Sequence, residues 1–125
     1  MTPLKQPHNS KLCGHTCIAM LADISVERVV ELIGHKRGTK TREVVATFRQ
    51  LGFECPDRLV VLRDLRKGRL GMYAELEMSM VKITFPGLSS WHWVVVHQGQ
   101  MYDPSPARAA DYGRPTSHLP LTRVG

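Results

Sequence analysis

One cysteine near the start of the chain is placed where it could act as a nucleophile. Cys13 stands at the expected first turn of a helix, where the helix dipole and the unpaired backbone amides favour the thiolate over the thiol. A thiolate is the state that attacks an acyl carbon. Gly14 follows it, and a residue without a side chain would let a substrate carbonyl approach while the Cys13 amide donates to the oxyanion. These positions predict acyl chemistry, with Gly14 in contact with the substrate.

An imidazole and a carboxylate that could complete such a site lie in the second half of the chain. His92 opens an apolar, strand-like run over residues 93–96, and Asp103 follows a turn signal at Gln98 and Gly99. If the chain reverses there, the hairpin returns Asp103 to the start of its first arm, where His92 lies. A carboxylate at that point would orient the imidazole that activates the thiol, which is the set of roles that defines a catalytic triad.

Two tryptophans flank the histidine in the sequence. Trp91 and Trp93 are two residues apart, and side chains two apart share one face of a strand. We predict that they wall one side of a substrate cleft, and core packing is an equally good interpretation of the pair.

The same cysteine could instead belong to a metal site. The zinc ligands would then be Cys13, Cys17, His15 and either His8 or His35. A structural zinc site usually has four ligands in closely spaced pairs, and the sequence offers no second close pair. Zinc would also leave His92 and Asp103 without a role. We therefore expect neither a metal nor a cofactor.

The apolar pattern changes from helical to strand-like along the chain. The expected helices cover residues 13–21, the stretch between the cap Ser25 and the stop Gly34, and residues 41–51. The expected strands cover residues 59–62, 80–85, 91–97 and 100–102. Residues 1–11 should run extended, and the proline-containing residues 105–125 should form a loop-rich tail. The sequence predicts a single α+β domain, with N-terminal helices packed on an antiparallel sheet.

Several of these residues together resemble a known family. The segments that carry the resemblance are Cys13-Gly14-His15-Thr16-Cys17-Ile18-Ala19-Met20-Leu21, Ile24-Ser25-Val26-Glu27, His92-Trp93-Val94-Val95-Val96 and Tyr102-Asp103-Pro104. They are similar to the bacteriocin-leader peptidases and their papain-like relatives, over roughly residues 6–105. The resemblance implies a papain-like cysteine peptidase fold in which Cys13, His92 and Asp103 form the triad.

The resemblance also implies a side-chain donor to the oxyanion. Family members use a glutamine that usually stands one residue closer to the cysteine than Gln6 stands to Cys13. A one-residue bulge in the extended lead-in would restore the geometry, and Asn9 is the alternative donor. Such domains often precede a membrane transporter and remove a leader peptide, whereas here we expect a stand-alone domain.

The expected activity is hydrolysis of a peptide or isopeptide bond, with a protein or peptide as the substrate. A glutamine deamidase or another cysteine acyltransferase would use the same three groups, so these alternatives stay open. A third interpretation is a non-catalytic module that binds an acidic partner through a basic face at residues 58–69. The basic residues of that face are Arg58, Arg63, Arg66, Lys67 and Arg69. No recognised nucleic-acid module or aromatic interleaving accompanies them, which favours a solvated face over a nucleic-acid site.

Length and composition bound these interpretations. With 125 residues, 42% hydrophobic and 22% charged, the chain is the size and type of one globular domain, which excludes wholesale disorder. Three cysteines are an odd and sparse set, so we expect reduced thiols. No apolar stretch is long enough to span a bilayer and no signal-peptide pattern is present, so we expect a cytoplasmic location. The net charge of +6 lies within residues 1–70, and nothing in the sequence indicates an oligomeric state.

Overall fold

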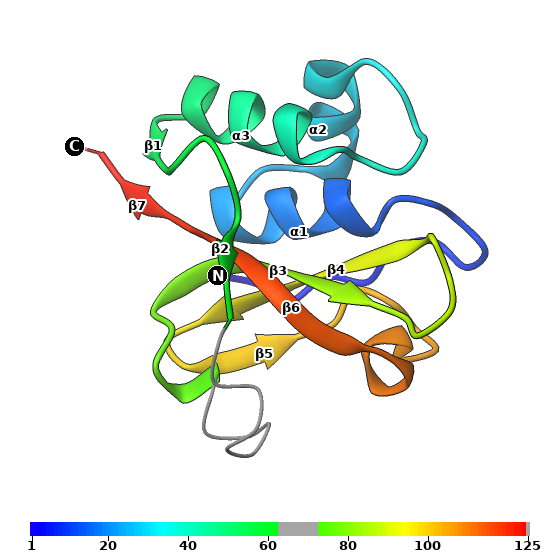
Figure 1. Cartoon of the computed structure of the whole chain (residues 1–125). Helices are drawn as coiled ribbons and strands as arrows, with labels where there is room; N and C mark the ends of the chain where they lie inside the picture. The colour runs from blue at the N-terminus through cyan, green and yellow to red at the C-terminus, as the bar shows by residue number, and fades with distance from the viewer. Residues whose placement is uncertain (63–72, 125) are drawn as a thin grey trace.

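The computed structural model describes residues 1–62 and 73–124, which form a layer of helices on one face of an antiparallel sheet (Figure 1). The helices are α1 (Cys13–Ala22), α2 (Val26–Ile33) and α3 (Thr41–Gln50), and a short 3-10 helix is η1 (Ala109–Tyr112). The strands are β1 (Phe53–Glu54), β2 (Val60–Val61), β3 (Met78–Thr84), β4 (Trp91–His97), β5 (Gln100–Tyr102), β6 (Arg114–Pro120) and β7 (Thr122–Arg123). The α+β class with three N-terminal helices is therefore confirmed.

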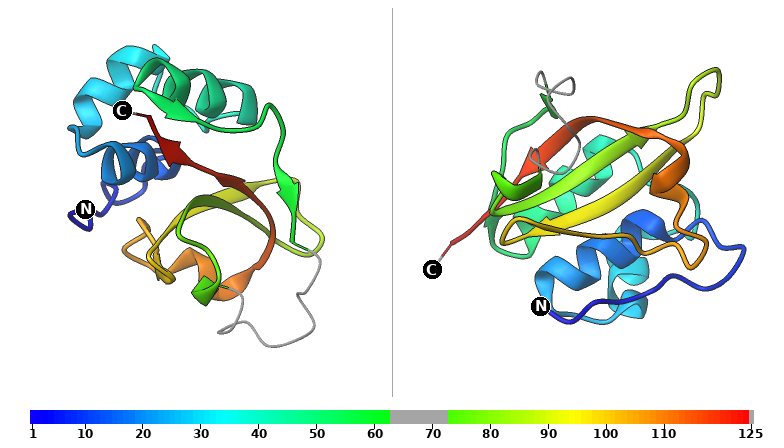
Figure 2. Two further views of the ribbon diagram at one scale, coloured as in Figure 1. Left: turned by 90° about the vertical axis from the view of Figure 1, so that its left-hand side faces the viewer. Right: turned by 90° about the horizontal axis from the view of Figure 1, so that it is seen from below.

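The main sheet has five antiparallel strands in the order β2-β6-β3-β4-β5, and β1 and β7 form a separate two-stranded ribbon. Figures 1 and 2 show α1 lying directly on the sheet, with α2 and α3 stacked on its outer side. The 3-10 helix η1 packs against the opposite face of the sheet, where Ala110 contacts a second buried cluster. Within the described ranges, no helix is both long and apolar enough to cross a membrane.

Local signals in the sequence explain the ends of α2. The Ser25 hydroxyl accepts a hydrogen bond from the Arg28 amide at 3.1 Å, which caps the first turn of the helix. Gly34 ends the helix in the left-handed region, with φ of 90°, which a glycine adopts without strain. The predicted bounds of α2 are confirmed.

The predicted hairpin is also confirmed. Gln98 and Gly99 both have positive φ, 52° and 79°, as a two-residue turn between twisted strands requires. The turn sets the register in which Val95 lies opposite Tyr102. One residue further, Asp103 leaves the end of β5 alongside the first half of β4.

The core lies mainly between the helices and the sheet. Trp93, Val95 and Met80 project from the sheet into a buried cluster with the apolar residues of α1 and α3. A smaller cluster around Val81 and Val94 fills the other face, beneath η1. Side chains of β4 therefore alternate between two buried faces, which explains why this strand is a nearly continuous apolar run.

The prediction of a loop-rich tail at residues 105–125 is wrong. These residues contain η1, β6 and β7, and β6 lies inside the main sheet between β2 and β3. Proline is tolerated in β6 because Pro115 stands beside a register irregularity between Lys82 and Ile83, and Pro120 is the last residue of the strand. Fully buried Leu119 holds β6 in the sheet.

The predicted strand at residues 59–62 is shorter than expected and is exposed. Only Val60 and Val61 form β2, and they are 45% and 62% exposed. Of the predicted basic face at residues 58–69, Arg58 is described and exposed. Residues Arg63, Arg66, Lys67 and Arg69 lie outside the described residues.

Truncation of Leu119 tests the position of β6. Leu119→Ala should lower the free energy of unfolding by about 2–5 kcal/mol, because it removes a fully buried side chain from the core. The matched control Leu88→Ala, at a residue that is 66% exposed, should change it by less than about 0.5 kcal/mol. Urea denaturation of both variants measures the difference. Equal stability of the two variants would show that β6 does not carry core residues.

Candidate active site

The hairpin brings the predicted base and its orienting group into direct contact. His92 Nε2 lies 2.6 Å from Asp103 Oδ1, and each of the two side chains is only 8% exposed. Two backbone amides fix the carboxylate further, because Ser105 donates to Oδ1 and Ala110 donates to Oδ2, each at 2.9 Å. Backbone amides that follow Asp103 in the chain therefore hold both of its carboxylate oxygens, and the orientation of the carboxylate sets that of the imidazole.

This contact keeps the histidine protonated at neutral pH. Burial alone would lower the pKa of His92, but its hydrogen bonds with Asp103 and with the Cys13 thiol outweigh the burial and raise the pKa to about 9. Burial would raise the pKa of Asp103, but the hydrogen bonds from His92, Ala110 and Ser105 lower it below its ordinary value. At pH 7 the pair is therefore an imidazolium and a carboxylate.

The cysteine lies on the other side of the imidazole. Cys13 is the first residue of α1, is partly buried, and interacts with the His92 side chain. Since Nε2 of His92 is engaged by Asp103, Nδ1 is the ring nitrogen that remains for the thiol. The N-cap residue of α1, Leu12, makes no side-chain hydrogen bond to the first turn, which leaves the first amides of the helix for a bound oxyanion. The structure therefore brings the three predicted triad residues together.

The other two cysteines lie in different surroundings. Cys17 is fully buried in the core, and that burial raises its pKa well above the ordinary value. Burial also raises the pKa of Cys55. In the described part of the chain, no three side chains of metal-binding type cluster, so zinc binding by Cys13 and Cys17 has no structural support.

The lead-in segment runs beside the carboxylate of the site. The Gln6 amide donates to the Pro104 carbonyl at 2.8 Å, and the Gln6 side chain donates from Nε2 to the Ser10 carbonyl at 2.9 Å. Its Oε1 is buried and has no hydrogen-bond partner among the described residues. Asn9, in contrast, is exposed and occupies a left-handed turn, with φ of 59°.

The two tryptophans have different environments. Trp91 is 36% exposed, whereas Trp93 has no exposed surface, so only Trp91 can contact a substrate and the prediction for Trp93 is wrong. Both indole nitrogens donate to the Thr39 carbonyl, at 3.2 Å for Trp91 and 3.4 Å for Trp93. Thr39, which joins the two tryptophans, was not recognised in the sequence, because its contacts are with residues far away in the chain.

Thr39 also corrects the interpretation of Gly14. A Cβ atom on Gly14 would lie 2.0 Å from Thr39 Oγ1, and both residues are buried. The side of Gly14 that lacks a side chain therefore faces this threonine and not an open surface. The glycine lets the loop of residues 35–40 pack directly on the first turn of α1.

A hydrogen-bonded group that the sequence analysis missed holds that loop in place. His15 Nε2 contacts the His35 carbonyl at 2.7 Å, and His35 Nε2 contacts Glu43 Oε2 at 2.5 Å. The other Glu43 oxygen accepts from the Lys40 amide at 2.9 Å, so one carboxylate binds both ends of the loop. The only signal of this in the sequence is a glutamate in the first turn of a predicted helix.

The chain was compared with known family models and with curated proteins. No known family model matches it, and no curated protein matches it either.

Substitution of Gly14 tests the close packing beside the cysteine. Gly14→Ala should destabilise the fold by about 1–3 kcal/mol, because the new Cβ overlaps the Thr39 side chain. Gly38→Ala is the matched control, since a Cβ there meets no atom within 4 Å, and its stability should change by less than about 0.5 kcal/mol. Thermal unfolding distinguishes the two variants. Equal melting temperatures for wild type and Gly14→Ala would refute the contact.

The protonation of His92 gives a second test. In the wild-type protein, the NMR shift of the His92 ring should titrate with a midpoint at about 9. In Asp103→Asn the midpoint should fall toward the ordinary value of 6.5, because the carboxylate that favours the imidazolium is lost.

The same shift predicts a change of stability with pH. Because the pKa of His92 is higher in the folded chain, protonation of His92 stabilises the fold fully below about pH 6.5. This contribution disappears as the pH rises through about 9. The advantage of wild type over Asp103→Asn in the free energy of unfolding should therefore shrink across that range. An advantage that stays constant from pH 6 to pH 10 would show that the carboxylate does not stabilise a charged His92.

Proposed function

We propose that this protein is a cysteine-dependent hydrolase of papain-like fold that cleaves a peptide or isopeptide bond. The proposal is carried by one observation, which is the placement of His92 between the Asp103 carboxylate and the Cys13 thiol at the start of α1. A thiol beside an imidazolium and a helix start is in the surroundings that favour a nucleophilic thiolate. The resemblance of the surrounding motifs to bacteriocin-leader peptidases supports the same conclusion.

The chemistry follows from the positions of these groups. The Cys13 thiolate attacks the carbonyl carbon of the substrate, an S–C bond forms, and the carbonyl oxygen becomes an oxyanion that the Cys13 amide and Gln6 stabilise. When the oxyanion collapses, the C–N bond breaks and the imidazolium of His92 gives its proton to the leaving amine. A water molecule then attacks the thioester, His92 accepts one of its protons, and the acid is released with the thiolate restored. Asp103 orients the imidazole throughout.

Gln6 and Asn9 are not equivalent in this mechanism. The Gln6 side chain lies in the segment bonded to Pro104, beside the triad carboxylate, and the second N–H of its amide remains available to an oxyanion. Asn9 is exposed on the turn. We therefore favour Gln6 as the side-chain donor.

The setting of the reaction follows from the thiols. Cys13, Cys17 and Cys55 are all free, and free thiols are typical of a reducing compartment such as the cytoplasm. The proposal therefore includes a cytoplasmic location.

Selective alkylation tests whether the thiol is activated. At pH 6, iodoacetamide should modify Cys13 at least about tenfold faster than it modifies a free peptide thiol, because an ordinary thiol with a pKa of about 8.5 is almost wholly protonated there. Peptide mapping by mass spectrometry identifies the labelled residue. Cys17, which is fully buried, and Cys55, whose pKa is raised, should stay unlabelled over the same period.

The His92→Ala variant is the control for this experiment. It should abolish the fast phase of Cys13 labelling while circular dichroism stays unchanged, since only the charged partner of the thiol is removed. Labelling of Cys55 before Cys13, or equal rates in wild type and His92→Ala, would rule out the proposed nucleophile. Those results would favour a non-catalytic module.

A further inference from the structure

A row of residues leads across the helix side of the sheet from Trp91, the neighbour of His92 in the sequence, to the opposite edge. Lys82 lies opposite both Trp93 and Ser117, and Ser117 lies opposite Val61. Directly paired residues share one face of a sheet, so Lys82, Ser117 and Val61 lie on the helix side, as Trp93 does. Trp91 belongs to the same face. We call Trp91, Lys82, Ser117 and Val61 the open strip.

The open strip is accessible where the helices do not cover the sheet. Val61 is 62% exposed and Trp91 is 36% exposed, and Lys82 and Ser117 are partly exposed. The Lys82 ammonium lies 5.2 Å from the centre of the Trp91 ring, which gives the strip a positive charge at the end that holds Trp91.

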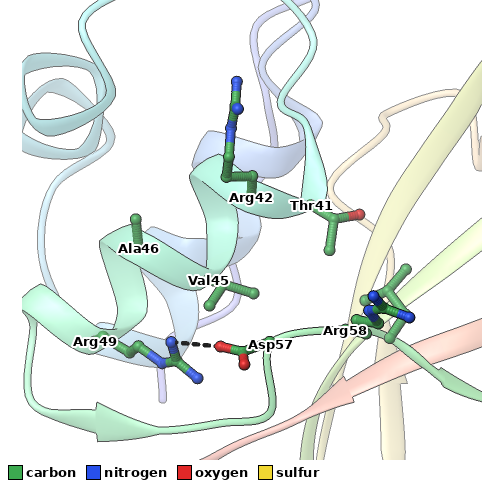
Figure 3. Close-up of a pocket in the computed structure, with 8 residues that line it drawn as sticks. Thr41, Arg42, Val45, Ala46, Arg49, Asp57 and Arg58 are labelled. Atoms are coloured by element: carbon green, nitrogen blue, oxygen red, sulfur yellow. Dashed lines mark ion pairs between the residues drawn. The ribbon is translucent and has the colours of Figure 1, made fainter.

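A pocket of about 620 Å³ lies beside the far end of the strip, between α3 and the segment that enters β2. We call it the α3 pocket (Figure 3); its lining includes Thr41, Val45, Arg49, Asp57, Arg58 and Leu59. Thr41 stands two residues after Thr39, whose carbonyl holds Trp91. The α3 pocket is therefore joined to the wall of the candidate site by a short, fixed stretch of chain.

The charges of the α3 pocket are unbalanced. Arg49 is bound to the Asp57 carboxylate at 2.8 Å and to the Cys55 carbonyl at 2.8 Å. Its charge is therefore paired and its side chain is held in place. Arg58 forms no ion pair with any residue in ranges 1–62 and 73–124. Arg42 also lines the pocket, but in Figure 3 its side chain rises from α3 away from the other charged groups. Among the described residues that line the pocket, Arg58 is thus the cation best placed to meet a ligand.

We propose that the open strip and the α3 pocket bind an extended, acidic stretch of the peptide substrate, with a carboxylate of that stretch at Arg58. This inference rests on the proposed function, because it names the class of substrate for the same site. Val61, Val45 and Leu59 offer apolar contacts to the side chains of the bound peptide. Lys82 and Arg58 attract its negative charge.

The dimensions of the sheet define where the acidic residue stands. Three strand spacings separate β4 from β2, a span of about 14 Å, which about four extended residues cover. The acidic residue should therefore lie about four to six positions from the scissile bond.

A binding experiment with the inert Cys13→Ala protein tests this proposal without catalysis. Fluorescence anisotropy should detect a fluorescein-labelled octapeptide of alternating Ala and Glu, but not the same peptide with Gln in place of Glu. Arg58→Glu should weaken the binding of the Glu peptide at least about fivefold, since it removes an attraction and adds a repulsion. The matched control Arg28→Glu makes the same change of charge on α2 and should leave the binding within about twofold.

Equal weakening by Arg58→Glu and Arg28→Glu would overturn the proposal, because it would reflect net charge alone. Binding of the Gln peptide as tight as that of the Glu peptide would overturn it as well.

A second measurement separates this inference from the proposed function. A randomised peptide library is incubated with the wild-type protein, and mass spectrometry records which peptides are cut. The wild type should prefer an acidic residue at the stated distance, and Arg58→Glu should shift the preference there to lysine. Cleavage with no acidic preference would overturn the inference and leave the proposed function standing. If no peptide is cut while binding depends on Arg58, the hydrolase proposal fails and the acidic binding site stands.

Discussion

The hydrogen bond between His92 and Asp103 is the constraint on which the rest of the site depends. Removing two charged groups from water is costly unless their geometry and remaining hydrogen bonds are satisfied. Here the carboxylate has three partners, which are the His92 ring and the amides of Ser105 and Ala110. Those amides lie on the segment between β5 and β6, so the path of the chain after the hairpin is part of the site. The position of β6 within the sheet fixes the far end of that segment.

One close contact fixes the helices relative to the strand that carries His92. Because Gly14 has no side chain, Thr39 packs against the first turn of α1, and the Thr39 carbonyl binds Trp91 and Trp93 on β4. A single loop therefore sets both the start of the helix that carries the cysteine and the strand that carries the histidine. Glu43 holds the ends of that loop. The relative position of thiol and imidazole is thus determined by packing between layers.

The sequence predicted those parts of the molecule that depend on neighbouring residues. The caps Ser25 and Gly34 define α2, and the turn at residues 98–99 brings Asp103 to His92. Each of these features depends on the types of a few consecutive residues, so the sequence predicts it. The strand β6 was missed because its prolines are turn signals locally, and only the pairing with β3 and the burial of Leu119 outweigh them. The contact of Gly14 with Thr39 was missed because the two residues are far apart in the sequence and no local motif links them.

The central claim is that Cys13 forms a covalent bond with an acyl group under the control of His92. The most direct measurement is intact-mass spectrometry of the protein after brief reaction with p-nitrophenyl acetate and an acid quench, with peptide mapping of the product. A small ester donates its acyl group without requiring the natural substrate to be known. We predict a single acetyl group on Cys13 in the wild type and no acetyl group in His92→Ala. Acetylation of Cys55 or another residue in preference to Cys13, or equal acetylation of Cys13 without His92, would contradict it.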